Sequence, residues 1–341
     1  MESTEERYAR QIRLAEIGAE GQARLMASSV LVLGCGALGS NLASLLTRAG
    51  VGRIRIVDRD ILELNNLQRQ VLFDEADVKQ GLPKAEAAAR KLRRVNSGVE
   101  VEAQVADATP RNIERLLGGI NVVVDATDNL ETRYLLNDAC VKLGTPWVYG
   151  GVVGTTGMTL SIVPGQGPCL RCVFPNPPPA GSLPTCETQG ILGTLPAAIA
   201  AVQATEAIKL LCGADRSPHL LSINLWSQVV QQIQVLRDEA CPACVERRFA
   251  FLEQESTAWV STLCGRNAIQ ITPAGEARLD LEELSRALAA LGAVSYNGLL
   301  LQFTPKESPH ELVLFPDGRV LIRGTTDEAI ARTLYARYVG T

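Results

Sequence analysis

A glycine-rich turn between an apolar run and a helical pattern restricts the fold of this chain more than any other feature. Residues 30–60 read VLVLGCGALGSNLASLLTRAGVGRIRIVDRD, with Gly34, Gly36 and Gly39 in the spacing G-x-G-x-x-G. The first glycine of this spacing permits a tight turn, the second lets a phosphate approach the backbone, and the third lets helix and strand pack closely. Asp58, after the next apolar run, is placed to accept hydrogen bonds from ribose hydroxyls. The stretch predicts a nucleotide-binding βαβ unit rather than a turn without a ligand, and it leaves open which nucleotide is bound.

Strand and helix patterns alternate through the first half of the chain. Strands are expected at residues 30–33, 54–57, 99–105, 122–124 and 147–149, and helices at 37–49, 84–95, 110–117 and 130–143. Such alternation predicts an α/β fold with a Rossmann-like, mostly parallel sheet that helices cover on both faces. Further strand patterns at 151–164, 219–227 and 229–237 predict an antiparallel extension of that sheet.

A polar stretch at residues 253–257 marks the expected domain boundary. Residues 1–255 would form the nucleotide-binding domain, and residues 256–341 a small C-terminal α+β module of unknown role, with elements in the order β-α-β-β-α. Within this module, FPDGRV at residues 315–320 is typical of a hairpin turn. In the first domain, the proline-rich segment 174–190 is too long and irregular for a simple turn, which is typical of a functional crossover segment.

Charge and apolar content exclude several classes of function. The net charge is −4 and the chain has no basic tract, so the electrostatic footprint of a nucleic-acid-binding protein is missing. The first residues are charged, unlike a secretory signal, and the most apolar long run, residues 191–204, is too short to span a bilayer. Nine cysteines without an export signal indicate metal or thiol chemistry rather than disulfides. We therefore expect a cytoplasmic protein that binds neither nucleic acid nor a membrane.

Charged side chains beyond Asp58 indicate nucleotidyl transfer rather than hydride transfer. Arg69 and Lys84 follow the second strand at a distance suited to a triphosphate. Asp125 and Asp128 follow the fourth strand, at the carboxyl edge where open α/β sheets bind ligands, and an acid there suits Mg²⁺. Each residue alone is a common surface charge. Together they favour an enzyme that neutralises phosphate charge while pyrophosphate leaves.

Motifs over the first 250 residues resemble those of the ubiquitin-activating superfamily, in its bacterial ThiF/MoeB/HesA branch. They are, in chain order, RYARQI (7–12), GCGALG (34–39), VDRDILELNNLQRQ (57–70), GLPKAEAA (81–88), DATDN (125–129), PCLRC (168–172), TCETQGILG (185–193), QATEAIKLL (203–211) and CPAC (241–244). The resemblance implies that the first domain is an ATP-binding adenylyltransferase domain. Using ATP and Mg²⁺, such an enzyme adenylates the C-terminal glycine of a ubiquitin-like sulfur-carrier protein that ends in Gly-Gly. Sulfur then comes from a donor such as a cysteine desulfurase.

The resemblance also implies roles for individual residues. Asp58 would hold the ribose, and Asp128 would bind Mg²⁺ or orient the reacting groups. Arg10 would be an arginine finger that reaches the triphosphate of the other subunit, since this family works as homodimers. The expected catalytic residues are Arg10, Arg69, Lys84, Asp128 and Cys186. The expected nucleotide-binding residues are Gly34, Gly36, Gly39, Asp58, Asp60, Asn66, Arg69, Lys84, Asp128 and Asn129, of which Asn66, Arg69 and Lys84 would contact phosphates.

Two C-x-x-C pairs, Cys169 with Cys172 and Cys241 with Cys244, allow two interpretations. Four thiolates around Zn²⁺ form a structural site, although the gap between these pairs is longer than in a compact zinc ribbon. The CPAC pair also resembles a thioredoxin-type dithiol, but it lacks the strand-to-helix context that lowers the pKa of a thiol. The family resemblance implies zinc at both pairs, and we expect a zinc site with all four cysteines as ligands.

Cys186 is the other cysteine of functional interest. It follows the proline-rich residues and precedes a helix expected near Gly193, whose N-terminus would lower the pKa of a thiol. In ThiF-like relatives the corresponding cysteine takes part in acyl-persulfide sulfur transfer, whereas MoeB-like relatives do not need theirs. We favour a covalent role for Cys186 over a spare thiol. The cysteines expected to be core thiols are Cys35, Cys140, Cys212 and Cys264.

Several functions remain open at this stage, and a ThiF-like enzyme of thiamine thiazole synthesis is favoured. A MoeB-like enzyme would instead activate the small subunit of molybdopterin synthase or another sulfur carrier. An NAD-dependent oxidoreductase would use the same glycine turn but has no use for Arg69 together with Lys84. A non-catalytic scaffold would bind a ubiquitin-like protein through a degenerate site, and the intact Asp58, Arg69, Lys84 and Asp128 argue against it.

Overall fold

The chain folds as two units, Met1–Gln254 and Glu255–Thr341, and each unit has a sheet of its own. The computed structural model describes residues 4–178, 186–253, 259–263, 267–273, 275 and 277–340. Cys264, which the sequence predicts to be a core thiol, lies outside the described residues.

An eight-stranded sheet forms the centre of the first unit, in the order β3-β2-β1-β4-β5-β6-β7-β8. Its strands are β1 (Ser29–Leu33), β2 (Arg53–Val57), β3 (Glu100–Gln104), β4 (Val122–Asp125), β5 (Trp147–Val153), β6 (Thr156–Ile162), β7 (His219–Asn224) and β8 (Val229–Gln234). Neighbours from β3 to β5 pair in parallel, and neighbours from β5 to β8 pair antiparallel. The predicted parallel sheet and its antiparallel extension are both confirmed.

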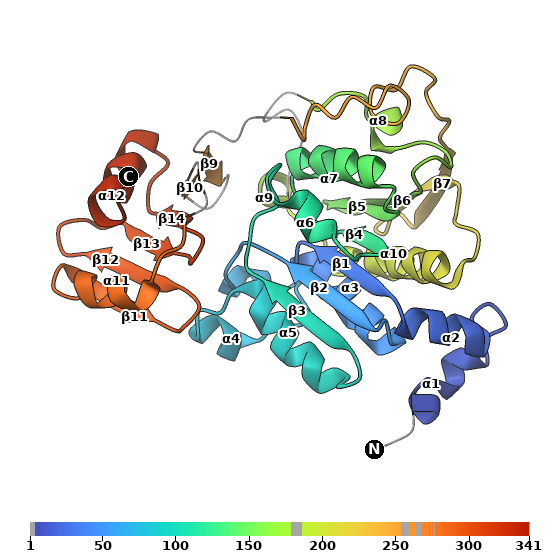
Figure 1. Ribbon diagram of the computed structural model, residues 1–341, viewed down its shortest axis with the longest axis horizontal. Helices are drawn as coiled ribbons and strands as arrows, with labels where there is room; N and C mark the ends of the chain where they lie inside the picture. The colour runs from blue at the N-terminus through green and yellow to red at the C-terminus, as the bar shows by residue number, and fades with distance from the viewer. Residues whose placement is uncertain are drawn as a thin grey trace. The chain divides into compact units, whose positions relative to one another are not determined.

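Helices cover both faces of this sheet (Figure 1). The helices of this unit are α1 (Thr4–Ile12), α2 (Gly18–Met26), α3 (Ala37–Ala49), η1 (Leu64–Asn66), α4 (Glu75–Lys79), α5 (Lys84–Val95), α6 (Ile113–Leu117), α7 (Leu130–Leu143), α8 (Leu170–Val173), α9 (Cys186–Gln189) and α10 (Leu195–Cys212). α3 packs against α5 and α10 on one face, and α6 packs against α7 in the apolar core of the other. Because both faces are covered, the central strands are buried apart from the first residues of β1 and β2, and β1 and β4 have near-continuous apolar sequences.

Local sequence signals set the ends of the helices beside the parallel strands. α3 begins directly after Gly36 and ends at Gly50, whose φ of 82° suits glycine. The side chain of Asn129 caps α7 by accepting a hydrogen bond from the backbone N–H of Thr132 at 2.8 Å, and Gly144 ends that helix with a φ of 74°. The helices predicted at 37–49, 84–95 and 130–143 are confirmed at both ends.

The helix predicted at 110–117 is wrong at its start, because α6 begins only at Ile113. The Asn112 side chain accepts a hydrogen bond from the backbone N–H of Thr109 and donates one to the carbonyl of Asp107, both at 2.8 Å. Asparagine side chains compete with helical backbone hydrogen bonds in this way and favour turns. The residues before Ile113 therefore form a turn.

Helix α10 begins within the most apolar run of the sequence, continues beyond its end and has 18 residues. By length and composition it could cross a membrane, which the run at 191–204 could not, and half of that window is buried inside the fold. It packs against α3, β5 and β6, and Gln203 donates hydrogen bonds to the carbonyls of Asp125 and Val148. Core helices of sheet proteins pass the same test of length and composition, so packing accounts for the apolar character of α10.

The second unit has a six-stranded antiparallel sheet in the order β11-β12-β13-β14-β10-β9. Its elements are β9 (Trp259–Leu263), β10 (Ala268–Thr272), α11 (Leu281–Leu288), β11 (Gly292–Tyr296), β12 (Leu301–Pro305), β13 (Glu311–Leu314), β14 (Val320–Arg323) and α12 (Glu328–Tyr338). Both helices share one apolar core with the sheet. They therefore lie on the same face of it.

The predicted order β-α-β-β-α is incomplete, because it lacks β9 and β11 and counts the hairpin of β13 and β14 as one strand. Most of β11 is half-buried or exposed, so its sequence, GAVSY, shows no clear apolar alternation. Its pairing with β12 makes it a strand. The hairpin predicted from FPDGRV is confirmed, since β13 pairs antiparallel with β14 and the backbone N–H of Phe315 donates to the carbonyl of Arg319.

Candidate functional site

The segments that carry most of the predicted site residues meet at the carboxyl edge of the parallel strands. β1 leads into the glycine turn, Asp58 directly follows β2, and Asp125 is the last residue of β4. The carboxylate of Asp58 joins the first two segments, because it accepts hydrogen bonds from the backbone N–H of Cys35 at 2.6 Å and of Asp60 at 2.7 Å. The glycine turn and the acid after β2 are therefore direct neighbours.

The three glycines of the turn occupy positions with different steric demands. Gly34 has a φ of 89°, and a Cβ on it would lie 2.7 Å from the carbonyl oxygen of Ala126. A Cβ on Gly39 would lie 2.0 Å from the carbonyl oxygen of Gly34. Beside Gly36, by contrast, a Cβ would meet only the Nε2 atom of Gln70, at 3.8 Å. The fold requires the first and third glycines, whereas the space beside Gly36 lets another molecule approach the backbone.

Lys84 places a positive charge in the interior of this edge. Its side chain is 3% exposed, and its Nζ atom lies 2.9 Å from the carboxylate of Asp60. Burial raises the pKa of Asp58, and the charge of Lys84 offsets part of that rise. Buried charges persist when they are paired. The ion pair with Asp60 therefore keeps the ammonium group of Lys84 at this edge even when no nucleotide is bound.

Asn66 and Arg69 lie in the segment after β2. Asn66 is buried, and its side-chain oxygen accepts a hydrogen bond from the backbone N–H of Glu63 at 3.2 Å. Arg69 is half-buried and donates to the carbonyl of Asn65 at 2.8 Å. A carbonyl does not neutralise a guanidinium, so Arg69 retains its charge and further N–H groups for an anion.

The two acids at the end of β4 have opposite surroundings. Asp125 is fully buried and accepts hydrogen bonds from the backbone N–H and the hydroxyl of Thr127, at 3.0 and 2.7 Å, and from Nε of Arg133 at 3.1 Å. Asp128 is exposed, and within the described part of the chain it makes no hydrogen bond or ion pair. Asp125 is therefore a structural group, and Asp128 is the acid whose carboxylate can accept a cation.

Two predicted nucleotide-binding residues also have roles within the fold. Asn129 caps α7, as described above, and Asp60 pairs with Lys84 through its carboxylate. The carbonyl of Asp60 also accepts a hydrogen bond from the backbone N–H of Lys84 at 2.9 Å. These bonds hold the neighbouring Asp128 and Lys84 in place, whether or not Asn129 and Asp60 touch a nucleotide.

Arg10 lies at the opposite, amino edge of the sheet. The hydroxyl of Tyr8 accepts a hydrogen bond from Asn96, and Gln11 donates one to the carbonyl of Ala49, so α1 is attached where α5 and α3 end. α3 begins at the glycine turn and has 13 residues, which corresponds to about 20 Å. Arg10 is exposed, and within one chain it is separated from the glycine turn by the length of that helix.

The four paired cysteines form one cluster, whose sulfur atoms all lie within 4.8 Å of one another. Cys169 and Cys241 are 3.6 Å apart, as are Cys172 and Cys244, and Cys169 and Cys172 are 3.9 Å apart. A zinc tetrahedron with Zn–S bonds of about 2.3 Å has S···S edges of about 3.8 Å. A disulfide would need about 2.05 Å. The geometry and the donor set fit zinc, which Cys169, Cys172, Cys241 and Cys244 would hold.

Cys186 begins its own short helix, α9, whereas α10 starts only at Leu195. The segment after α9 is attached next to the end of β5, since Gly154 donates to the carbonyl of Gly190 and Leu192 donates to the carbonyl of Gly154. This attachment places α9 near the carboxyl edge of the sheet. The side chain of Cys186 is not among the described ones, so its lowered pKa stays a prediction.

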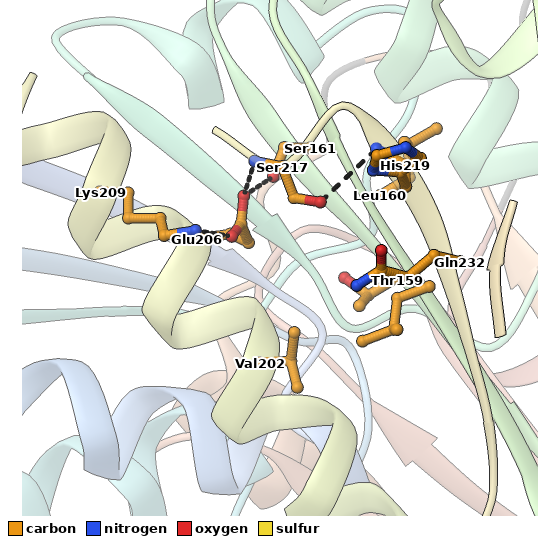
Figure 2. A pocket seen from close by; sticks show the side chains of 10 residues that line it. Thr159, Leu160, Ser161, Val202, Glu206, Lys209, Ser217, His219 and Gln232 are labelled. Carbon is orange, nitrogen blue, oxygen red and sulfur yellow. Dashed lines mark hydrogen bonds and ion pairs between the residues drawn. The ribbon is translucent and has the colours of Figure 1, made fainter. Parts of the chain in front are cut away.

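A cavity of about 220 Å³ lies between α10 and the antiparallel strands (Figure 2). Its lining includes Glu206, one of whose oxygens lies 2.6 Å from Nζ of Lys209. The other oxygen accepts from the hydroxyl of Ser161 and the backbone N–H of Ser217. Glu206 thereby connects α10 to the sheet. Ser161 pairs with Val148 near the start of β5, and the cavity is therefore remote from the carboxyl edge.

The sequence reasoning missed two arginines at this edge, Arg59 and Arg133. Arg59 lies 2.9 Å from the carboxylate of Asp107. Arg133 is buried on α7 and pairs with Asp125. The sequence contained a signal for Arg133. A charged residue within an otherwise buried helical stretch needs a partner, and the preceding strand ends in an acid, Asp125, that had no assigned role.

Comparisons with known proteins agree with these observations. A sequence model of the ThiF family matches residues 8–243. The sulfur carrier protein ThiS adenylyltransferase of Bacillus subtilis (strain 168) is 42% identical over 98% of this chain and 99% of its own length. The SAMP-activating enzyme E1 of Haloferax volcanii is 42% identical over 71% of this chain and 89% of its own length. Escherichia coli MccB, solved with ATP, has a TM-score of 0.61 at 23% identity, covering 70% of this chain and 74% of the MccB chain, and this likeness shows the fold alone.

The resemblance inferred from the motifs is confirmed. The family model spans more than half of the chain, and a relative with 42% identity matches almost its whole length. This chain therefore belongs to the ThiF family.

Proposed function

We propose that this chain is an adenylyltransferase that uses ATP to adenylate the C-terminal glycine of a ubiquitin-like sulfur-carrier protein, in thiamine thiazole synthesis. The observation that carries this proposal is the match over 98% of the chain to an enzyme named as a ThiS adenylyltransferase. Relatives named as the adenylyltransferase and sulfurtransferase MOCS3 match a smaller share, 71% of this chain in Sus scrofa. They give weaker support to the MoeB-like alternative. The named relatives are not oxidoreductases, which disfavours the NAD-dependent alternative.

The carboxyl edge can perform this reaction through charge neutralisation. The terminal carboxylate of the carrier attacks the α-phosphorus of ATP, a C–O–P bond forms, and the bond to the β-phosphate breaks as pyrophosphate leaves. Asp58 accepts from the ribose, the backbone at Gly36 admits the phosphates, and Lys84 and Arg69 compensate their charge. Bound Mg²⁺ supplies further positive charge on the phosphate oxygens, and Asp128 is the carboxylate that would hold it. Nothing in this scheme requires redox chemistry.

Arg10 completes this scheme only if the enzyme is a homodimer. Within one chain Arg10 is a helix length from the glycine turn, so it serves the triphosphate bound by a partner subunit. The forked N–H donors of a guanidinium suit phosphate oxygens. Exposure of Arg10 and its lack of a described ion pair support this role.

Zinc and Cys186 have separate tasks in the proposal. The four-cysteine cluster binds a structural Zn²⁺ that fastens the turn at Cys169–Cys172 to the segment at Cys241–Cys244. Cys186 takes the sulfane sulfur from the persulfide of a cysteine desulfurase, which is left as a thiol, and the resulting Cys186 persulfide displaces AMP from the acyl-adenylate to form an acyl persulfide. In this proposal the reaction takes place in the cytoplasm and involves neither nucleic acid nor a membrane.

ATP–pyrophosphate exchange tests the proposal directly. We expect exchange when the enzyme is mixed with a ThiS-type carrier ending in Gly-Gly, and no exchange with the same carrier lacking its last glycine. A molybdopterin synthase small subunit, tested in parallel, distinguishes the MoeB-like alternative. If neither carrier supports exchange and NADH binds without competition from ATP, the oxidoreductase alternative replaces the proposal.

Gly36→Ala should separate nucleotide binding from folding. Space for a Cβ exists beside Gly36, so we expect a melting temperature close to that of the wild type. The added methyl group would occupy the approach of the phosphates and weaken ATP binding by about tenfold or more, equivalent to about 1.4 kcal/mol. Titration calorimetry and thermal melts measure the two effects. Gly39→Ala is the control for the fold, since its Cβ would overlap the carbonyl of Gly34. Unchanged ATP affinity in Gly36→Ala would contradict the assigned role.

A further inference from the structure

Arg133 connects three segments at the carboxyl edge, although it touches none of the expected substrate positions. Its Nε atom donates to the carboxylate of Asp125 at 3.1 Å, and its Nη2 atom donates to the carbonyls of Thr127 at 2.5 Å and Gly150 at 2.9 Å. The guanidinium also lies over the ring of Tyr149, 5.2 Å from its centroid. The side chain thus ties α7 to the end of β4, to the loop after it and to β5.

The same contacts fix the loop that carries Asp128. Thr127 is held by its N–H and hydroxyl, both bonded to Asp125, and by its carbonyl, bonded to Arg133. On the other side, Asn129 is held by the cap of α7. Asp128 therefore stands between two anchored residues, while its own side chain is exposed. An acid held in this way needs little reorganisation to accept a cation.

The charges of Arg133 and Asp128 also interact. Burial works against the charge of Arg133, but its pKa is nevertheless raised, chiefly by Asp125 and in part by Tyr149 and Asp128. Asp125 uses both carboxylate oxygens on Thr127 and Arg133, which leaves Asp128 as the cation-accepting acid of this loop.

We propose that Arg133 is a positioning residue for adenylation: it holds the loop of residues 125–129 in the conformation that presents Asp128 to the metal-bound triphosphate. This inference rests on the proposed function of the site. Arginine is needed because one guanidinium donates to a carboxylate and to two carbonyls at fixed angles, which the single ammonium of lysine does not reproduce. Removing such an outer group typically weakens metal affinity by about 10- to 100-fold.

A matched control exists in Arg55 on β2. Arg55 is also buried, and its Nε atom donates to the carboxylate of Glu102 at 2.9 Å. Its Nη1 atom donates to the carbonyls of Leu116 and Gly118, so it makes the same kinds of contact as Arg133. These contacts attach the end of α6 to the sheet and do not involve the Asp128 loop. Arg55→Lys therefore measures the effect of replacing a buried arginine that has no contact with the Asp128 loop.

The test compares Arg133→Lys and Arg55→Lys in the full-length protein, well below their melting temperatures. For Arg133→Lys we expect faster amide hydrogen exchange in peptides spanning residues 126–132. We also expect the Mg²⁺ concentration for half-maximal ATP–pyrophosphate exchange to rise about 10- to 100-fold, with the binding of metal-free ATP little changed. For Arg55→Lys, amide exchange in residues 126–132 and the Mg²⁺ requirement should both match the wild type, even if its melting temperature falls as far as that of Arg133→Lys.

Equal behaviour of the two variants would overturn the inference, because Arg133 would then be a structural residue like Arg55. Absence of pyrophosphate exchange in the wild type would overturn the proposed function instead. In that case amide exchange and the affinity for Mn²⁺–ATP decide the inference, and unchanged values in Arg133→Lys would reject it.

Discussion

Replacing Asp128 by alanine should lower carrier-dependent ATP–pyrophosphate exchange by about 10²- to 10³-fold, the effect expected when one preorganised charge contact to the reacting phosphates is removed. Asp128 is exposed at the carboxyl edge and has no hydrogen bond or ion pair with any described residue, so its removal leaves the fold intact. Exchange of radiolabelled pyrophosphate into ATP measures the loss. A thermal melt of the same sample verifies that the variant is folded.

Asp215→Ala provides the control for this prediction. Asp215 is an exposed acid in the loop between α10 and β7, and its removal changes net charge by the same amount. We expect wild-type exchange from that variant. Full activity in Asp128→Ala would mean that the site does not use this acid, and the assignment of the carboxyl edge would have to be abandoned.

Mixing variants tests the contribution of the partner subunit in the same assay. Arg10→Ala and Asp128→Ala should each be nearly inactive, because every site in either homodimer lacks one required residue. After exchange of subunits, half of the dimers would be mixed, and one of their two sites would be intact, which restores about a quarter of wild-type activity. No recovery after verified subunit exchange would place Arg10 outside the site of the partner.

Loss of the cysteine cluster should have the largest effect on stability. Cys241 is fully buried in the apolar core beside α7, and its sulfur lies 3.6 Å from that of Cys169. Cys241→Ser should reduce the zinc content from about one ion per chain to a small fraction of that and lower the melting temperature by about 10 °C. Elemental analysis by mass spectrometry and thermal melts check both values. A strong chelator should have the same effect on the wild type.

Cys140→Ser is the matched control, since Cys140 is an equally buried thiol in the same apolar core but outside the cluster. Its serine hydroxyl loses some stability through burial, about 1–3 kcal/mol, and should leave zinc content unchanged. If Cys241→Ser keeps its metal, or if the wild type contains none, the four cysteines are not a zinc site and the redox interpretation has to be tested.

Local sequence signals were sufficient for the elements that make the nucleotide site. Gly34 and Gly39 are confirmed as positions where a side chain would collide with backbone, because the steric demand of a tight βα turn is local and its spacing is visible in the chain. The parallel sheet was predicted from the alternation of strand and helix patterns along the chain. β11 was missed because its strand conformation depends on pairing with β12 rather than on its own composition.

The sequence by itself determined the βαβ start of the fold and the family, because steric and apolar patterns act between neighbours in the chain. The family resemblance had singled out Asp128, but only the tertiary structure gave the physical difference between the two acids, since Asp125 is buried and bonded to Arg133 whereas Asp128 is exposed. The same holds for the cysteines: the C-x-x-C pairs were visible in the sequence. Their assembly into one cluster depends on folding that brings sulfur atoms 72 positions apart within 3.6 Å of each other.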